Sequence, residues 1–201
     1  MEPSSGIVLN RSFYLGDNVT ESACSLLGKY LFTSIDHQLT GGMIMETEAY
    51  KGIGDRASHA YGGRRTKRTR VMFAEGGVAY VYLCYGMHSL FNIVTNEREV
   101  PDAILIRGLS VTHGVVTIEH RLKRQVTPGR LISGPGLVSR ALGITTALSG
   151  LPLIRDMDKD GIWVEDRGVV VPEDQITFSP RIGVGYAGED ALLPYRYVWS
   201  V

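Results

Sequence analysis

Short extended runs separated by glycine-rich turns make up most of this chain, and only three stretches have the apolar spacing of a helix. In the extended runs, apolar or β-branched residues alternate with other residues, which is the pattern of strands with one buried face. Strands and helices do not alternate regularly, as they would in a parallel βαβ fold. The sequence therefore predicts an α+β fold around an antiparallel sheet, with residues 1–201 as one domain.

A helix and a hairpin are predicted near the start of the chain. Apolar side chains recur at helical spacing from Val19 to Tyr30, which predicts a helix of about three turns. Two extended runs follow, at residues 31–39 and 43–50. Residues 40–42 between them contain two glycines, so we expect the turn of the hairpin there.

The second of these extended runs carries two acids. Side chains on a strand alternate between the two faces of the sheet, so Ile44, Glu46, Glu48 and Tyr50 are predicted to share one face. A carboxylate followed by an aromatic residue on a strand is by itself a weak signal, because most such acids are surface residues. Its neighbours along the chain make it more informative.

A basic loop and an aromatic hairpin follow the two acids. Residues 51–70 are rich in glycine and basic side chains and read as a long functional loop. Residues 77–95 read as a second hairpin, with Tyr80 and Tyr82 on one face, Gly86 near the turn and Tyr85 close to the tip. Aromatic rings stack on bases, and basic side chains neutralise phosphates. Together with the acids, they indicate a nucleic-acid site that contains a carboxylate.

One buried strand and two more helices are predicted further along, before a tail of short strands. The strand is expected at residues 103–109 and the helices at residues 112–124 and 134–144. The tail is expected to be extended at residues 163–171, 181–188 and 195–201.

Composition restricts the class of protein without fixing its function. The formal net charge is zero, but residues 56–140 hold 13 Lys and Arg against 5 Asp and Glu, while residues 155–174 are acidic. A basic region on a neutral protein can hold phosphates, and on charge alone a solvated surface without a partner is equally consistent. Two cysteines without zinc spacing suggest neither a disulfide scaffold nor a metal site. No apolar run suggests a membrane segment, and no secretory signal is recognisable, so an intracellular protein is expected.

Six blocks in order resemble the alkyladenine (3-methyladenine) DNA glycosylase family, over roughly residues 7–199. They are ETEAY (46–50), ASHAYGGRRTKRTRVMF (57–73), AYVYLCYGMHSLFNI (79–93), ILIRGL (104–109), SGPGLVSRALGI (133–144) and RIGVGYAGE (181–189). Many relatives carry histidine where Tyr186 stands in the last block. The resemblance implies a curved antiparallel sheet with flanking helices and a protruding β-hairpin.

The resemblance also implies catalytic roles for two residues and phosphate contacts for the basic loop. Glu48 matches the general base that deprotonates the attacking water, and Arg107 matches an arginine near that water and the lesion phosphate. Glu46 is expected to be a supporting acid, since one carboxylate is enough. Backbone contacts are expected from Arg64, Arg65, Lys67, Arg68 and Arg70.

Five further residues match the family's base-binding and intercalating positions. Tyr50, His59 and Tyr82 match residues that sandwich the flipped base, and Asn92 matches a pocket-floor residue that crowds the 2-amino group of guanine. Tyr85 matches the aromatic side chain that enters the duplex and fills the space left by the flipped nucleotide. Such a wedge recovers part of the stacking energy that flipping costs.

The function implied is that of a monofunctional base excision repair glycosylase. Such an enzyme acts as a monomer on duplex DNA that contains a damaged purine, in the bacterial cytoplasm or the eukaryotic nucleus. Its substrates would be 3-methyladenine, 7-methylguanine, hypoxanthine and ethenoadenine, and its product an abasic site. No cofactor or metal is expected, and no lysine in the matched pocket motifs suggests lyase chemistry.

Two other classes of function are compatible with parts of this pattern. A module that recognises damaged or bent DNA without cutting it could use the same basic loop and aromatic residues, but it gives Glu48 no role. A metal-dependent nuclease could be built on Glu46 and Glu48, and its sensitivity to EDTA would distinguish it from a glycosylase.

Overall fold

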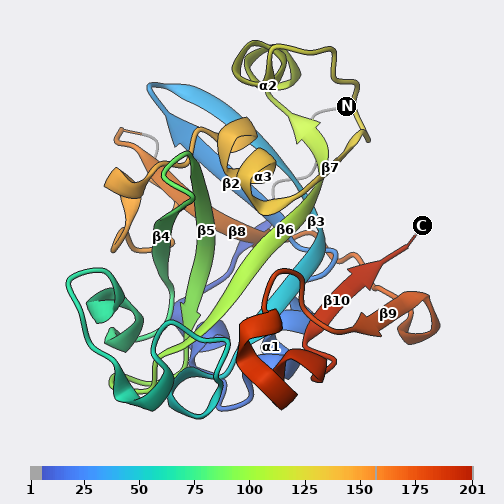
Figure 1. Cartoon of the computed structure of the whole chain (residues 1–201). Helices are drawn as coiled ribbons and strands as arrows, with labels where there is room; N and C mark the ends of the chain where they lie inside the picture. Colours follow the sequence, from blue (N-terminus) through green and yellow to red (C-terminus); the bar gives the residue numbers. More distant parts are fainter. Residues whose placement is uncertain (1–5, 157, 201) are drawn as a thin grey trace.

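The computed structural model describes residues 6–156 and 158–200 (Figure 1). It contains ten strands, three α-helices and seven short 3-10 segments within these residues. The strands are β1 (Ile7–Val8), β2 (Tyr30–Ile35), β3 (Gln38–Tyr50), β4 (Val78–Cys84), β5 (His88–Thr95), β6 (Asp102–His113), β7 (Leu131–Ser133), β8 (Gly161–Asp166), β9 (Ile176–Ser179) and β10 (Arg196–Trp199). The α-helices are α1 (Val19–Ser25), α2 (Val115–Leu122) and α3 (Pro135–Leu142). The 3-10 segments are η1 (Arg11–Leu15), η2 (Gly52–Gly54), η3 (Tyr61–Gly63), η4 (Thr69–Phe73), η5 (Thr146–Leu148), η6 (Glu173–Gln175) and η7 (Gly185–Leu192).

All strand pairs in the sheet are antiparallel, and the sheet curls strongly, with the helices around it (Figure 1). Its main order is β1-β8-β2-β3-β6-β5-β4, while β7 pairs with β6 and β9 pairs with β10. The long strand β3 has β6 along one edge; along the other it pairs first with β2 and then, at residues 46–48, with β10. The predicted α+β fold with an antiparallel sheet is confirmed.

The hydrophobic core lies where the helices pack on the sheet. Helix α3 packs on β5 and β6, and Val138 and Leu142 are buried among core residues such as Phe91. This helix begins with Pro135, whose fixed φ and missing N–H suit a first helical position, and Gly143 ends it at a φ of 72°. Both α2 and α3 thus lie within the ranges predicted from sequence. Among the described residues, no helix is long and apolar enough to cross a membrane.

The first helix is shorter than its apolar spacing predicts. The Asn18 side chain caps its N-terminus by accepting a hydrogen bond from the backbone of Thr20 (3.1 Å), and the helix ends at Ser25. At Gly28 the backbone takes a φ of 78°, and its N–H donates to the Ile44 carbonyl oxygen (3.0 Å). The chain therefore leaves the helix to pair with β3, and the last part of the predicted helix forms a turn and the start of β2.

The turn of the first hairpin also differs from the prediction. It lies at Asp36 and His37, which have φ values of 53° and 58°, as a tight two-residue turn between right-twisted strands requires. Gly41 and Gly42 are paired residues inside β3. A Cβ atom at Gly41 would overlap the Phe32 ring, so the glycine there provides space for close packing rather than a turn.

The second hairpin has the predicted position and tip. Strands β4 and β5 pair from Val78 opposite Val94 to Cys84 opposite His88. The chain reverses at Tyr85 and Gly86, both with positive φ. Tyr85 is 90% exposed, so its side chain is presented to solvent at the end of the paired strands.

We expect Tyr85→Asn to leave the protein at least as stable as the parent, with a gain in unfolding free energy of up to about 1 kcal/mol. The reason is that asparagine adopts a φ of 50° more readily than tyrosine, and the exposed ring contributes little packing. Urea unfolding would measure the change. The matched control is Met87→Asn, since Met87 is also exposed (75%) but is not among the positive-φ residues. A clear loss of stability in Tyr85→Asn alone would contradict the expectation.

Candidate active site

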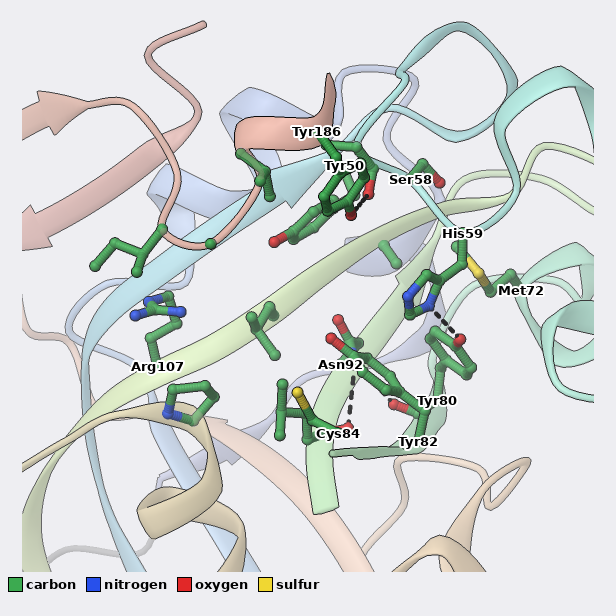
Figure 2. Close-up of a pocket in the computed structure, with 18 of the residues that line it drawn as sticks. Tyr50, Ser58, His59, Met72, Tyr80, Tyr82, Cys84, Asn92, Arg107 and Tyr186 are labelled. Atoms are coloured by element: carbon green, nitrogen blue, oxygen red, sulfur yellow. Dashed lines mark hydrogen bonds between the residues drawn. The ribbon is translucent and has the colours of Figure 1, made fainter. Parts of the chain in front are cut away.

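A pocket of about 520 Å³ opens beside the second hairpin (Figure 2). Its walls come from three parts of the chain that are distant in sequence: the β4–β5 hairpin, the loop at residues 57–59 and the segment at residues 182–186. Tyr50 from the end of β3, Arg107 and two apolar residues from β6, Met72 from η4 and Pro135 from α3 also line it. The pocket is large enough for one purine base, which a flat aromatic lining can hold by stacking.

The three aromatic residues that the resemblance assigns to base binding all line this pocket. The rings of His59 and Tyr82 are in edge contact, with centroids 4.6 Å apart and planes at 78°. Tyr50 lies across the cavity from Tyr82 and Asn92 (Figure 2). The structure therefore brings these side chains together, although β3, the loop and the hairpin are separate in sequence.

His59 is held as a neutral ring. Its Nδ1 and the hydroxyl of Tyr80 are hydrogen-bonded at 2.8 Å, which fixes the orientation of the imidazole. Burial, and then the charges of Arg68 and Arg64, lower the pKa of His59 to about 4, while burial raises the pKa of Tyr80 to about 12. At neutral pH, His59 can therefore offer hydrogen bonds and a stacking edge, but it carries no charge. The sequence placed Tyr80 on the same hairpin face as Tyr82 and gave no sign of this contact or of its burial.

The carboxylate of Glu48 is completely buried, directly behind the pocket wall. One oxygen, Oε1, accepts a hydrogen bond from the Ile182 N–H (2.8 Å) and lies 3.3 Å from Arg107 Nε. The other, Oε2, accepts one from the hydroxyl of Tyr50 (2.8 Å). All three contacting residues line the pocket.

The pKa of Glu48 is raised above its ordinary value. Burial is the largest cause, and the negative charge of Glu46 adds to it. Arg107, the Ile182 N–H and the Tyr50 hydroxyl act in the opposite direction, because they stabilise the charged form. A carboxylate with a raised pKa is a stronger base once it is ionised, which is the property that proton abstraction from water requires.

The predicted face of β3 is correct for the two acids and wrong for Ile44. Glu46 and Glu48 both contact Arg107, so they share a face. Ile44 is instead buried in the same core cluster as Ala49. The register between β3 and β6 shifts between Ile44 and Glu46, and this irregularity breaks the alternation that the prediction assumed.

Glu46 is tied to two arginines. Its Oε1 accepts hydrogen bonds from Arg107 Nε (2.9 Å) and from Arg196 Nε (2.7 Å) on β10. Opposite Glu46, Gly108 leaves the space that the acid needs, since a Cβ there would lie 2.8 Å from the Cβ of Glu46. Two cations against one acid disfavour a metal ion in the same place. Among the described residues, no group of three His, Cys, Asp or Glu side chains could hold a metal ion.

Asn92 lies on β5 at the floor of the pocket and is 3% exposed. Its side-chain amide group donates hydrogen bonds to the carbonyl oxygens of Tyr80 (3.1 Å) and Leu90 (3.3 Å). These two bonds fix the side chain, so a base that enters the pocket meets a rigid amide at this position.

The segment that follows β9 is not the extended strand that its glycines and β-branched residues predicted. It runs from the buried Arg181 into the 3-10 segment η7. Both terminal nitrogens of Arg181 pair with Asp55, and its guanidinium lies 4.7 Å from the centre of the Tyr50 ring. The hydroxyl of Tyr186 donates to the Ala57 carbonyl oxygen (3.1 Å) across the pocket mouth. The RIGVGYAGE block indicated this segment, but nothing in the sequence showed its partners.

The five basic residues of the loop are all exposed. Arg64 and Arg68 lie near enough to His59 to lower its pKa, which places them beside the pocket. Arg65 is ion-paired with Glu99 and covers the Phe73 ring at 4.1 Å. A positive surface therefore adjoins the mouth of the aromatic pocket. Tyr85, largely exposed at the hairpin tip, also borders the pocket.

Comparison with known proteins shows the family of this chain. The family model described as "Methylpurine-DNA glycosylase (MPG)" matches residues 12–200. A protein from Chlamydia felis is 39% identical over 96% of this chain and 97% of its own length, and one from Bacillus cereus is 41% identical over 94% of both. Both are named "Putative 3-methyladenine DNA glycosylase". The chain belongs to the methylpurine-DNA glycosylase family, whose members are DNA repair enzymes that hydrolyse N-glycosyl bonds.

Proposed function

We propose that this protein is a monofunctional glycosylase that flips an alkylated or deaminated purine out of duplex DNA and hydrolyses its glycosidic bond. The substrates proposed are 3-methyladenine, 7-methylguanine, hypoxanthine and ethenoadenine, and the product is an abasic site. The observation that carries the proposal is the buried, hydrogen-bonded carboxylate of Glu48 directly behind an aromatic pocket of about 520 Å³. That arrangement suits a base that acts on a water molecule.

In the proposed mechanism, Glu48 takes a proton from water as the water attacks the anomeric carbon. The departing purine leaves with the electrons of the glycosidic bond, through a transition state with oxocarbenium character. The positive charge of Arg107, which lines the pocket, would orient the water and the phosphate of the lesion. The Ile182 N–H and the Tyr50 hydroxyl hold the carboxylate in one orientation while the proton is transferred.

Stacking on the aromatic rings and steric exclusion of poorly fitting purines would select which purine is excised. Tyr50, His59 and Tyr82 offer ring surfaces, and electron-poor or cationic purines stack well on electron-rich rings. Cationic alkylated purines leave readily, whereas neutral lesions need a hydrogen-bond donor at the leaving base. His59 is neutral above a pH of about 4, so it would help as a hydrogen-bonding group and not as a charged acid.

The exposed face supports binding to duplex DNA. Tyr85 would enter the stack from the rigid hairpin and occupy the space of the flipped nucleotide. Arg64, Lys67 and Arg68 are exposed on the loop and would neutralise phosphates on either side of the lesion. Among the described residues, no lysine lines the pocket, which supports water and not an amine as the nucleophile. We therefore propose that the strand stays intact after base release.

The first experiment compares Glu48→Gln with the parent on duplexes that carry one hypoxanthine or one ethenoadenine, with EDTA present. The variant keeps the shape of the side chain but not its basicity, so base release should fall by about 100- to 10,000-fold while binding persists. Release of free base and intactness of the strand are measured separately. Glu75→Gln, a change of an exposed acid that is paired with Arg11, is the matched control. Full activity in Glu48→Gln, or strand cleavage by the parent, would refute the mechanism.

A second prediction concerns Asn92. Replacing its rigid amide by Asn92→Ser should make room for a 2-amino group, so undamaged guanine and 7-methylguanine should be released faster relative to hypoxanthine. The ratio of single-turnover rates for these bases is the measurement. Equal ratios for the variant and the parent would show that Asn92 does not exclude the 2-amino group.

A third prediction concerns pH. Glu48 must be ionised to act, so release of hypoxanthine should fall as the pH drops through its pKa, with a midpoint above the value of about 4.3 of an ordinary glutamate. The pKa of His59 is lowered to about 4, so His59 should add no transition near its ordinary value of about 6.5. His59→Gln should therefore lower the rate without moving the midpoint. A midpoint that moves with this substitution would assign the transition to His59 instead.

A further inference from the structure

We propose that Glu46 and Arg196 are positioning residues that set the basicity of Glu48 through Arg107. The inference rests on the proposed role of Glu48 as the base. It concerns four alternating charges in a row, from Arg196 on β10 through Glu46 and Arg107 to Glu48. Neither Glu46 nor Arg196 lines the pocket, so both act through a neighbour.

The geometry shows which acid holds Arg107. Its Nε carries a single hydrogen, and that hydrogen is donated to Glu46 Oε1 at 2.9 Å. Glu48 Oε1 lies further away, at 3.3 Å, and already accepts the Ile182 N–H. Glu46 thus keeps the Arg107 Nε–H away from the carboxylate that must remain basic. A hydrogen bond from this group to Glu48 would stabilise the charged carboxylate and make it a weaker base.

Arg196 offsets the negative charge of Glu46. Its Nε donates to the same Glu46 oxygen at 2.7 Å, and Arg196 is held in turn by the hydroxyl of Ser179 (3.1 Å). It also lies directly opposite Glu48 in the pairing of β10 with β3. Within the described residues, Glu46, Arg107 and Glu48 are at most 8% exposed, so solvent screens their interactions weakly. Removing one member of the row therefore leaves an uncompensated charge near Glu48.

Removing the charge of Glu46 and removing the charge of Arg196 should shift the pKa of Glu48 in opposite directions. Glu46→Gln removes a negative charge and weakens the hydrogen bond that holds the Arg107 Nε–H, so the ionised form of Glu48 is favoured and its pKa falls. Arg196→Gln removes a positive charge, so the ionised form is disfavoured and the pKa of Glu48 rises. A merely structural role for either residue would reduce activity in both variants without opposite shifts.

The remaining polar and charged groups around Glu48 are the same in all these variants. From its own strand they include the Tyr50 hydroxyl, and from β4 the Tyr82 hydroxyl. Arg181 and its partner Asp55 lie on the far side of Tyr50. None of these groups is altered, so a shift in the pH profile can be assigned to the charge that was removed.

The test is the pH dependence of single-turnover hypoxanthine release by the full chain, in the parent, Glu46→Gln, Arg196→Gln and the double variant. We expect the acidic midpoint to move down by about one pH unit in Glu46→Gln and up by a similar amount in Arg196→Gln. In the double variant it should return toward the parent value. The plateau rate of Glu46→Gln should be about threefold lower, since its base is weaker.

The controls separate charge from folding and from the proposed function itself. Arg196→Lys keeps the charge and should keep the parent midpoint, whereas Arg11→Gln and Glu75→Gln remove an exposed ion pair elsewhere and should leave the profile unchanged. Shifts in the same direction, or no shifts, would overturn the inference. If Glu48→Gln retained activity, the proposed function would fail instead, whatever the profiles of the other variants.

Discussion

Keeping one carboxylate out of water is the constraint on which this site depends. A buried charge is costly unless it is paired and hydrogen-bonded. Glu48 meets this requirement with two hydrogen-bond donors, the Tyr50 hydroxyl on its own strand and the Ile182 N–H after β9, and with the nearby positive charge of Arg107 on β6. β3 and β6 are paired neighbours in the curled sheet, and the segment that follows β9 contacts Glu48 on β3 through the Ile182 N–H. Tyr50, Ile182 and Arg107 also line the pocket, so burying the Glu48 carboxylate and building the pocket are one structural problem.

A second buried ion pair joins the walls of the pocket. The Arg181 side chain is fully buried and pairs with Asp55, at the start of the loop that carries His59. It also donates hydrogen bonds to the carbonyl oxygens of Ala49 and Asp190 and lies against Tyr50. The guanidinium of Arg181 thus links β3 and the loop at residues 51–70 to Asp190, at the other end of the segment that begins with Arg181 itself. Its planar set of donors can satisfy several acceptors at once, which a lysine could not do.

The sequence predicted the elements whose causes are local and missed those set by distant contacts. The hairpin at residues 77–95 followed from alternation and a turn glycine. The first helix was predicted too long because Gly28 turns the chain into contact with β3, and Ile44 was placed on the wrong face because of a register shift. The alternation of side chains along a strand was enough to predict that Glu46 and Glu48 share one face. Their arginine partners come from other strands, one of them 150 residues away from Glu46, and local patterns carry no information about such pairs.

The pairing of β10 with β3 has a consequence for the order in which the enzyme becomes functional during synthesis. A nascent chain that has reached β8 already contains both acids, the hairpin and the basic loop. It lacks the Ile182 N–H and Arg196, which follow β8 in the sequence. Contacts of such long range form late. Until these residues are made, Glu46 lacks its Arg196 partner and Glu48 lacks the Ile182 N–H, so the proposed site is completed only after its pocket walls on β3, β4 and β5 already exist.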